Sequence, residues 1–169
     1  MQVPKILNTS NYNTQFKAKI IKTPYLESGI KYAQNQASLH EKNIFLNALE
    51  HIKNDTDMKT FSIDGVKGQH TKSNLIPEGY YKKYQININD RKAYENIGSV
   101  GNSTDGEQCL YGINDFIFRH YGELVGFELM DKRTSWLALA DELEVQRANA
   151  LIKAGSELKE RLEKLAKEI

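Results

Sequence analysis

An alternating segment followed by a turn limits the fold more than any other feature. Between residues 84 and 88, apolar and polar side chains alternate, which is the period of a half-buried strand. Asn89-Asp90 then has turn chemistry, and Lys92 to Ile97 can return as an antiparallel partner. The side chains expected to face the core are Tyr84, Ile86 and Ile88.

Shorter strands are expected on the N-terminal side of this pair. Gln15 to Ile21 alternates in the same way, with lysines on one side and Phe16, Ala18 and Ile20 on the other. Thr60 to Ile63 is a further candidate strand, and Asp64-Gly65 after it predicts a turn. Together these segments predict a small, mainly antiparallel sheet.

Three helix starts carry side chains that can cap them. Thr23 precedes a proline at the first helical position, and Ser38 and Thr104 each stand three residues before a glutamate, as in a capping box. The helices predicted from these starts and from apolar spacing are Pro24–Ala37, Leu39–Asn54 and Asp105–Tyr121. Gly29, on the apolar face of the first helix, indicates that a neighbour approaches closely.

The last part of the chain is predicted to be helical. Phe127 to Met130 is compatible with a short strand or a linker, and Ser135 to Ile169 has helical spacing with a kink or break at Gly155-Ser156. We therefore predict an α+β fold, with a small mainly antiparallel sheet packed against helices and a C-terminal helical arm or hairpin. Residues 1–130 are predicted to form the core domain, and residues 131–169 a helical segment of that domain or an interaction arm.

One helix face near the C-terminus carries an apolar seam. Its members recur at spacings of four, three and four residues: Leu158, Leu162, Leu165 and Ile169. A seam of this kind must be covered by something. Either it docks on its own domain, or it pairs with another chain as a homo-oligomer or protein-partner contact.

Charge and hydropathy limit the partners. The chain has 169 residues with 23 basic and 22 acidic side chains, a formal net charge of +1, whereas nucleic-acid binders usually carry a basic excess. No apolar run approaches the roughly 18 residues of a membrane span, and the first residues lack the apolar core of a secretion signal. We therefore expect a cytoplasmic protein without a membrane partner. The chain has a single cysteine, Cys109, so it can form no intrachain disulfide.

Two segments have the composition of weak binding sites. The loop from Gly98 to Gly106 stands before a helix start and can offer backbone N–H groups to an anion, although it matches neither the Walker nor the dinucleotide pattern. The anion-binding candidates are Gly101, Ser103 and Thr104. Lys82 and Lys83 stand among tyrosines that could stack nucleic-acid bases on a sheet. The alternatives are a capped strand-to-helix connection and an edge strand shielded by lysines.

No catalytic residue, metal site or cofactor is predicted. Cys109 and His120 are eleven residues apart on one predicted helix, about 16 Å, which is too far for a nucleophile–base pair. His40 and His51 have the same spacing and cannot chelate one ion alone. We expect Cys109 to be buried on the apolar face of its helix, as free cysteines commonly are.

The N-terminal segment Asn13-Thr14-Gln15-Phe16-Lys17-Ala18-Lys19 follows a short polar lead. This opening resembles the start of many uncharacterised small proteins of uncultured, gut-associated bacteria. The resemblance implies a bacterial, cytoplasmic origin. It implies no activity, cofactor or site residue.

These observations favour a non-enzymatic intracellular interaction module that self-associates through its C-terminal helix. Two alternatives stay open: a small enzyme with a site near the Gly98–Gly106 loop, and an RNA-binding accessory protein. A pocket with converging polar groups beside Cys109 or Thr104 would favour the enzyme. A contiguous lysine face would favour nucleic acid, and an exposed apolar stripe would favour a protein partner.

The alternation at residues 84–88 makes a testable prediction. Ile86→Ala should lower the free energy of unfolding by about 2–5 kcal/mol, because it removes buried methyl groups. Asn87→Ala should cost much less, since neighbouring residues of a strand face opposite sides. Urea unfolding of the two variants measures the difference, and equal tolerance at the two positions would contradict the register.

Overall fold

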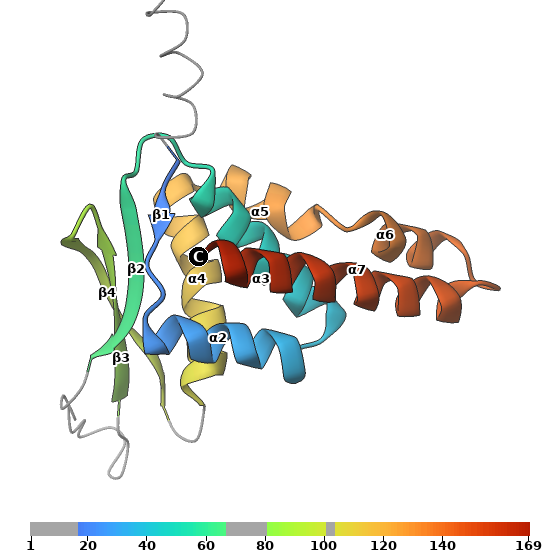
Figure 1. Ribbon diagram of the computed structural model, residues 1–169, viewed down its shortest axis with the longest axis horizontal. Helices are drawn as coiled ribbons and strands as arrows, with labels where there is room; N and C mark the ends of the chain where they lie inside the picture. The colour runs from blue at the N-terminus through green and yellow to red at the C-terminus, as the bar shows by residue number, and fades with distance from the viewer. Residues whose placement is uncertain (1–16, 67–80, 101–103) are drawn as a thin grey trace, which may run out of the picture.

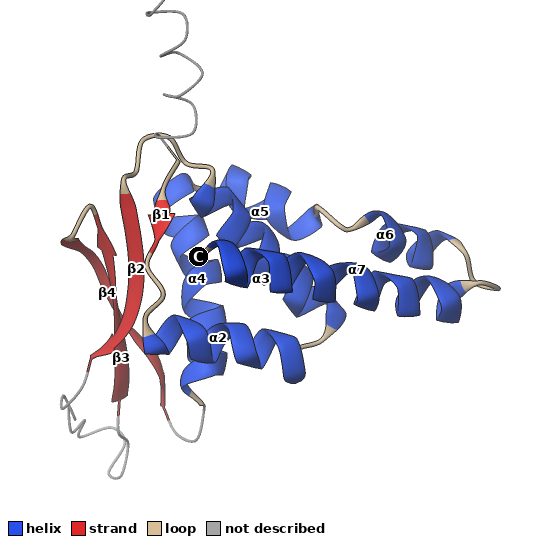
Figure 2. Cartoon of the chain, viewed as in Figure 1, coloured by secondary structure: helices blue, strands red, loops and turns tan. Residues whose placement is uncertain are grey.

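The computed structural model describes residues 17–66, 81–100 and 104–169, with the backbone alone at 81–82 and 97–100. One sheet has the order β1-β2-β3-β4. β1 (Lys19–Ile20) is parallel to β2 (Thr60–Val66), and β3 (Tyr81–Ile88) and β4 (Arg91–Val100) follow antiparallel. The helices are α2 (Pro24–Asn35), α3 (Leu39–Lys53), α4 (Asp105–Tyr121), α5 (Glu123–Asp131), α6 (Ser135–Glu142) and α7 (Arg147–Glu168). They lie on one side of the sheet (Figure 1, Figure 2), so the predicted α+β fold is confirmed.

The β3–β4 hairpin agrees with the alternation in the sequence. Tyr84 and Ile86 are buried, and Ile88 is partly buried against the same core. Asn89 and Asp90 make the turn with φ values of 53° and 63°. Positive φ at both central residues is the hairpin turn that best fits the twist of the strands.

Side-chain caps begin three of the helices at the predicted residues. The hydroxyl oxygen of Thr23 accepts a hydrogen bond from the Leu26 backbone N–H at 3.1 Å. Ser38 and Thr104 cap α3 and α4 in the same way, each at 3.2 Å. Each cap satisfies a backbone donor that the first turn of a helix leaves without a partner.

Two glycines bring α2 and α4 unusually close together. A Cβ added to Gly29 would lie 2.7 Å from the sulfur of Cys109, and one added to Gly106 would lie 2.5 Å from the carbonyl oxygen of Ser28. Only a residue without a side chain allows this approach. The close neighbour predicted for Gly29 is therefore confirmed, and it is the buried thiol of α4.

The predicted turn at Asp64-Gly65 is wrong. β2 continues to Val66, and Gly65 pairs with Tyr84 of β3. A Cβ at Gly65 would lie 3.2 Å from the ring of Tyr25, so the glycine makes room for an aromatic side chain of α2. The dipeptide has turn composition, but cross-strand pairing and this packing decide its structure.

Two predictions in the C-terminal part are also wrong. Phe127 to Met130 is neither strand nor linker, because it lies within α5, which starts after Gly122 with a φ of 94°. α7 runs unbroken through Gly155 and Ser156, and the helical segment is interrupted earlier, between α6 and α7. A glycine inside a helix costs only about 1 kcal/mol, which the packing of α7 on the body outweighs.

The close contact at Gly29 generates a prediction. Gly29→Ala should lower the free energy of unfolding by about 1–3 kcal/mol, because the new methyl group overlaps Cys109. Combining it with Cys109→Ala should cost less than the sum of the two single changes. Equilibrium urea unfolding measures all three variants.

Gly155→Ala is the matched control for the Gly29→Ala variant. The nearest atom to its added Cβ is the Leu39 side chain at 3.5 Å, an ordinary contact. This variant should gain about 0.5–1 kcal/mol from helix propensity and reduced freedom of the unfolded chain. A Gly29→Ala variant as stable as Gly155→Ala would contradict the close packing of α2 on α4.

Candidate functional site

The start of α4 is a capped strand-to-helix connection. Thr104 caps the helix, while Gly101 and Ser103 lie outside the described residues. An open groove of about 280 Å³ beside Thr104 lies between α2 and α4. Its charged lining consists of Lys31 and Asp105, whose charges offset each other. The described lining of the groove therefore carries no net charge to attract an anion, and the Thr104 hydroxyl is engaged in capping.

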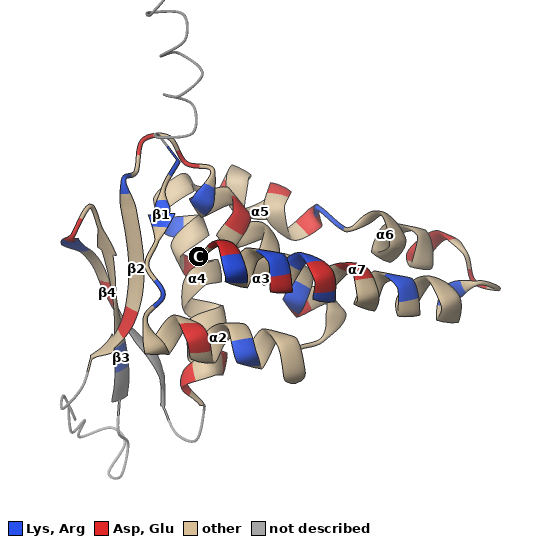
Figure 3. Ribbon diagram, viewed as in Figure 1, with Lys and Arg blue, Asp and Glu red and all other residues tan. Residues whose placement is uncertain are grey.

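Of the segment considered for nucleic acid, the structure describes the side chains of Lys83 and Tyr84, and these two do not form a stacking platform. Lys83 is half-buried on β3, and the Lys82 side chain lies outside the described part of the chain. The neighbouring Tyr84 ring is buried and its hydroxyl accepts a hydrogen bond from Asn96. Figure 3 shows basic and acidic residues interspersed along the helices. Among the described residues, no helix combines the length and apolar character needed to cross a bilayer.

Cys109 does not form a reactive site with the histidines that the structure describes, His40, His51 and His120. Cys109 is fully buried, and this burial raises the pKa of its thiol, which disfavours the thiolate. His120 is exposed at the other end of α4, where it stacks on Phe116. His51 packs against Tyr121, whereas His40 is exposed. Within the described ranges, no three His, Cys, Asp or Glu residues are grouped to hold a metal ion.

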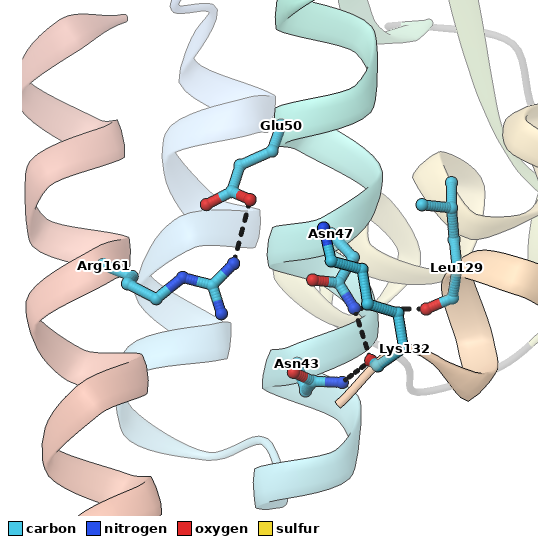
Figure 4. Close-up of polar contacts among 6 residues, drawn as sticks. All are labelled: Asn43, Asn47, Glu50, Leu129, Lys132 and Arg161. Atoms are coloured by element: carbon cyan, nitrogen blue, oxygen red, sulfur yellow. Dashed lines mark hydrogen bonds and ion pairs between the residues drawn. The ribbon is translucent and has the colours of Figure 1, made fainter. Parts of the chain in front are cut away.

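The C-terminal seam is covered by the protein itself. Leu158, Leu162 and Leu165 are buried in the main core, and Ile169 packs partly against it. The guanidinium of Arg161 donates to the Glu50 carboxylate at 2.9 Å, which ties α7 to α3 (Figure 4). Of the two outcomes that the spacing left open, docking on the same domain is observed. These four residues are therefore not an exposed partner surface.

Apolar side chains are exposed instead on α5. Leu124, Phe127 and Met130 are 76%, 56% and 40% exposed, and we call these three residues the α5 face. Gly126 turns the other way and lies directly on the Phe118 ring, where a Cβ would be 2.5 Å from a ring carbon. Phe127 meets the same ring edge-on, with centroids 5.3 Å apart. The helix is thus seated on α4 while its α5 face points to solvent.

Two buried asparagines of α3 hold the end of α5 in place. The Asn47 amide donates to the backbone carbonyls of Leu129 and Lys132 at 3.1 and 2.8 Å, and Asn43 donates to that of Lys132 at 2.6 Å (Figure 4). The last carbonyls of a helix have no partner within the helix. The asparagines satisfy them from a neighbouring helix and so fix the position of α5.

A second exposed apolar set lies at the end of a helical hairpin. α6 packs on the first half of α7, and together they extend away from the body (Figure 1). The two helices bury a small set of their own: Leu137, Ala140, Ala150 and Ala154. Lys153 lies 4.3 Å above the Trp136 ring, and Arg133 forms an ion pair with Asp141.

The hairpin end exposes large apolar residues to solvent. Val145, in the connection between the helices, is 99% exposed, and Ile152 of α7 is 69% exposed. Leu143, two residues before Val145, is also exposed. Sequence reasoning missed both this set and the α5 face, because spacing alone does not show which apolar positions remain uncovered.

The comparisons with known proteins add no relative. No family model, no curated protein and no solved structure matches this chain. The similarity of residues 13–19 to proteins of gut-associated bacteria stays a prediction.

The asparagine contacts generate a prediction. Asn47→Ala should lower the free energy of unfolding by about 1–3 kcal/mol, because it removes buried hydrogen-bond donors from two carbonyls. Asn35→Ala, at an exposed position of α2, is the matched control and should change stability by less than about 0.5 kcal/mol. Thermal or urea unfolding compares them, and equal stability of the two variants would contradict the role of Asn47.

Proposed function

We propose that the protein is a non-enzymatic interaction module that contacts its partner through the α5 face and the end of the α6–α7 hairpin. The observation that carries this proposal is the exposure of large apolar side chains on both elements, up to 76% on α5 and 99% at the hairpin end. Leaving apolar surface in water costs about 25 cal/mol per Å² relative to burying it. Contiguous exposed apolar patches therefore mark sites of association.

The rigidity of α5 supports the same function. A surface that is already ordered loses little conformational entropy when it binds. Asn43 and Asn47 fix the C-terminal end of α5, and Gly126 seats its middle on Phe118. The α5 face is therefore presented on a fixed helix rather than on a mobile loop.

The two alternatives have less support. An enzyme near the Gly98–Gly106 loop would need reactive groups that face a pocket, whereas Cys109 is buried and Thr104 caps α4. An RNA-binding surface would need exposed rings beside Lys83, and the neighbouring ring that the structure describes, that of Tyr84, is buried. The exposed apolar residues of α5 and the hairpin end therefore support an interaction module better than the loop supports an enzyme or Lys83 supports RNA binding.

Site-specific photo-crosslinking in the native cell tests the proposal. A benzophenone amino acid replaces Phe127 in one variant, Ile152 in a second, and Ala93, which is exposed on β4, in a third. We expect discrete crosslinked proteins from positions 127 and 152 and none from position 93, measured by gel shift and mass spectrometry. An absence of discrete products at both 127 and 152, with the variants folded, would refute the interaction module.

A further inference from the structure

The outer hairpin, which we define as α6 together with residues 147–154 of α7, has its own packing. Of the helices and strands that the structure describes, α7 alone makes extensive contact with α6. The two helices extend away from the body (Figure 1). Their buried apolar side chains are separate from the main core cluster: Leu137, Ala140, Ala150 and Ala154. The burial that orders the outer hairpin is therefore not the burial that orders the body.

Burial stabilises the outer hairpin much less than it stabilises the body. Leu137 is the one large side chain of the outer hairpin that is fully buried, and its other buried apolar residues are alanines. The main core, by contrast, buries Phe45, Phe61 and Phe116 in one cluster. Hydrophobic stabilisation increases with the apolar area removed from water, and an alanine side chain is a single methyl group. Opening the outer hairpin therefore costs less free energy than unfolding the body.

The polar contacts of α6 do little to hold it on α7. The ion pair of Arg133 with Asp141 joins α6 to the connection that leads into it. The Thr134 hydroxyl accepts a hydrogen bond from the Leu137 backbone N–H at 3.1 Å, which caps α6 itself. Lys153 lies above a ring of α6, but its side chain is exposed, and cation–π contacts are weak where water reaches them. Separating α6 from α7 therefore breaks this weak contact and those of the small apolar set.

Both ends of the outer hairpin are anchored to the body. On the α5 side, the carbonyl oxygen of Lys132 accepts hydrogen bonds from Asn43 and Asn47, which hold the chain to α3 just before α6. On the α7 side, Leu158 is buried in the main core. Segments that open separately from the rest of a protein often coincide with a supersecondary motif of this kind. The two anchors therefore set the limits of the segment that can open.

We infer that the outer hairpin is a conformational device that opens as one unit while the body stays folded. Opening separates α6 from α7 and uncovers Leu137 and the alanines that face it. The protein then has two forms, which differ in the apolar surface that the hairpin offers. A ligand that contacts the uncovered residues binds the open form and shifts the equilibrium toward it. This inference concerns the chain by itself, so it does not depend on the proposed interaction function.

Native-state hydrogen exchange, followed by NMR at urea concentrations below the unfolding transition, tests the inference. The amides to compare are the hydrogen-bonded ones of α6, from Ala138 to Leu143, and those of the buried middle of α3. The α6 amides should be protected, but should exchange at least about tenfold faster than those of α3. Their exchange should also depend less on urea, because opening the hairpin exposes less surface than unfolding the whole chain.

Two leucine substitutions form a matched pair for this experiment. Leu137 and Leu158 are both fully buried, the first in the outer hairpin and the second in the main core. Leu137→Ala should speed exchange in α6 by about tenfold or more and leave exchange in α3 unchanged, because the lost contacts are confined to the outer hairpin. Leu158→Ala should instead speed exchange in α3, because it removes a side chain from the main core.

Three results would overturn the inference. Equal protection and equal urea dependence of α6 and α3 in the wild type would show a single cooperative unit. A Leu137→Ala variant that speeds exchange in α3 as much as in α6, or that does not fold at all, would show the same. Wild-type α6 amides without measurable protection would show that the closed form is absent. The crosslinking at positions 127 and 152 tests the interaction module separately, so either proposal can fail without the other.

Discussion

The structure depends on the burial of α3 on nearly every side. Its apolar residues Phe45, Leu49 and Ile52 fill the main core, while Asn43 and Asn47 on another side hold α5. Glu50 meets α7 on a third side. A helix enclosed in this way cannot be simply amphipathic, because it must satisfy the backbone ends of its neighbours as well as exclude water. Buried residues of α3 therefore determine where the exposed α5 face lies.

Local chemistry made much of this fold predictable. Thr23, Ser38 and Thr104 cap the helices that their sequences indicated, because a cap involves only the first turn. The alternation around Ile86 gave the correct strand faces, since the period of two is a property of the strand itself. In each case the deciding interactions are within a few residues of each other.

The missed features depend on contacts between distant parts of the chain. Gly65 is held in a strand by pairing with Tyr84, and Gly155 lies near Leu39 of α3; both neighbours are far away in sequence. The helical spacing of Leu158 to Ile169 was correct, but only the fold shows that the main core covers it. One signal was available: Asn43 and Asn47 are four residues apart on a helix and must share a face. Their role could not be read from this, because the carbonyls that they bind belong to residues 129 and 132.

The separate buried set of the helical hairpin has a consequence for substitutions. Leu137, Ala140, Ala150 and Ala154 are not part of the main core, which α7 joins only from Leu158 onward. Substitutions at distant sites that share no neighbours affect stability nearly independently. The stability cost of a substitution at the hairpin end therefore does not depend on substitutions made in the body. A change at Val145 or Ile152 therefore alters the exposed surface of the hairpin and leaves the packing of the main core as it is.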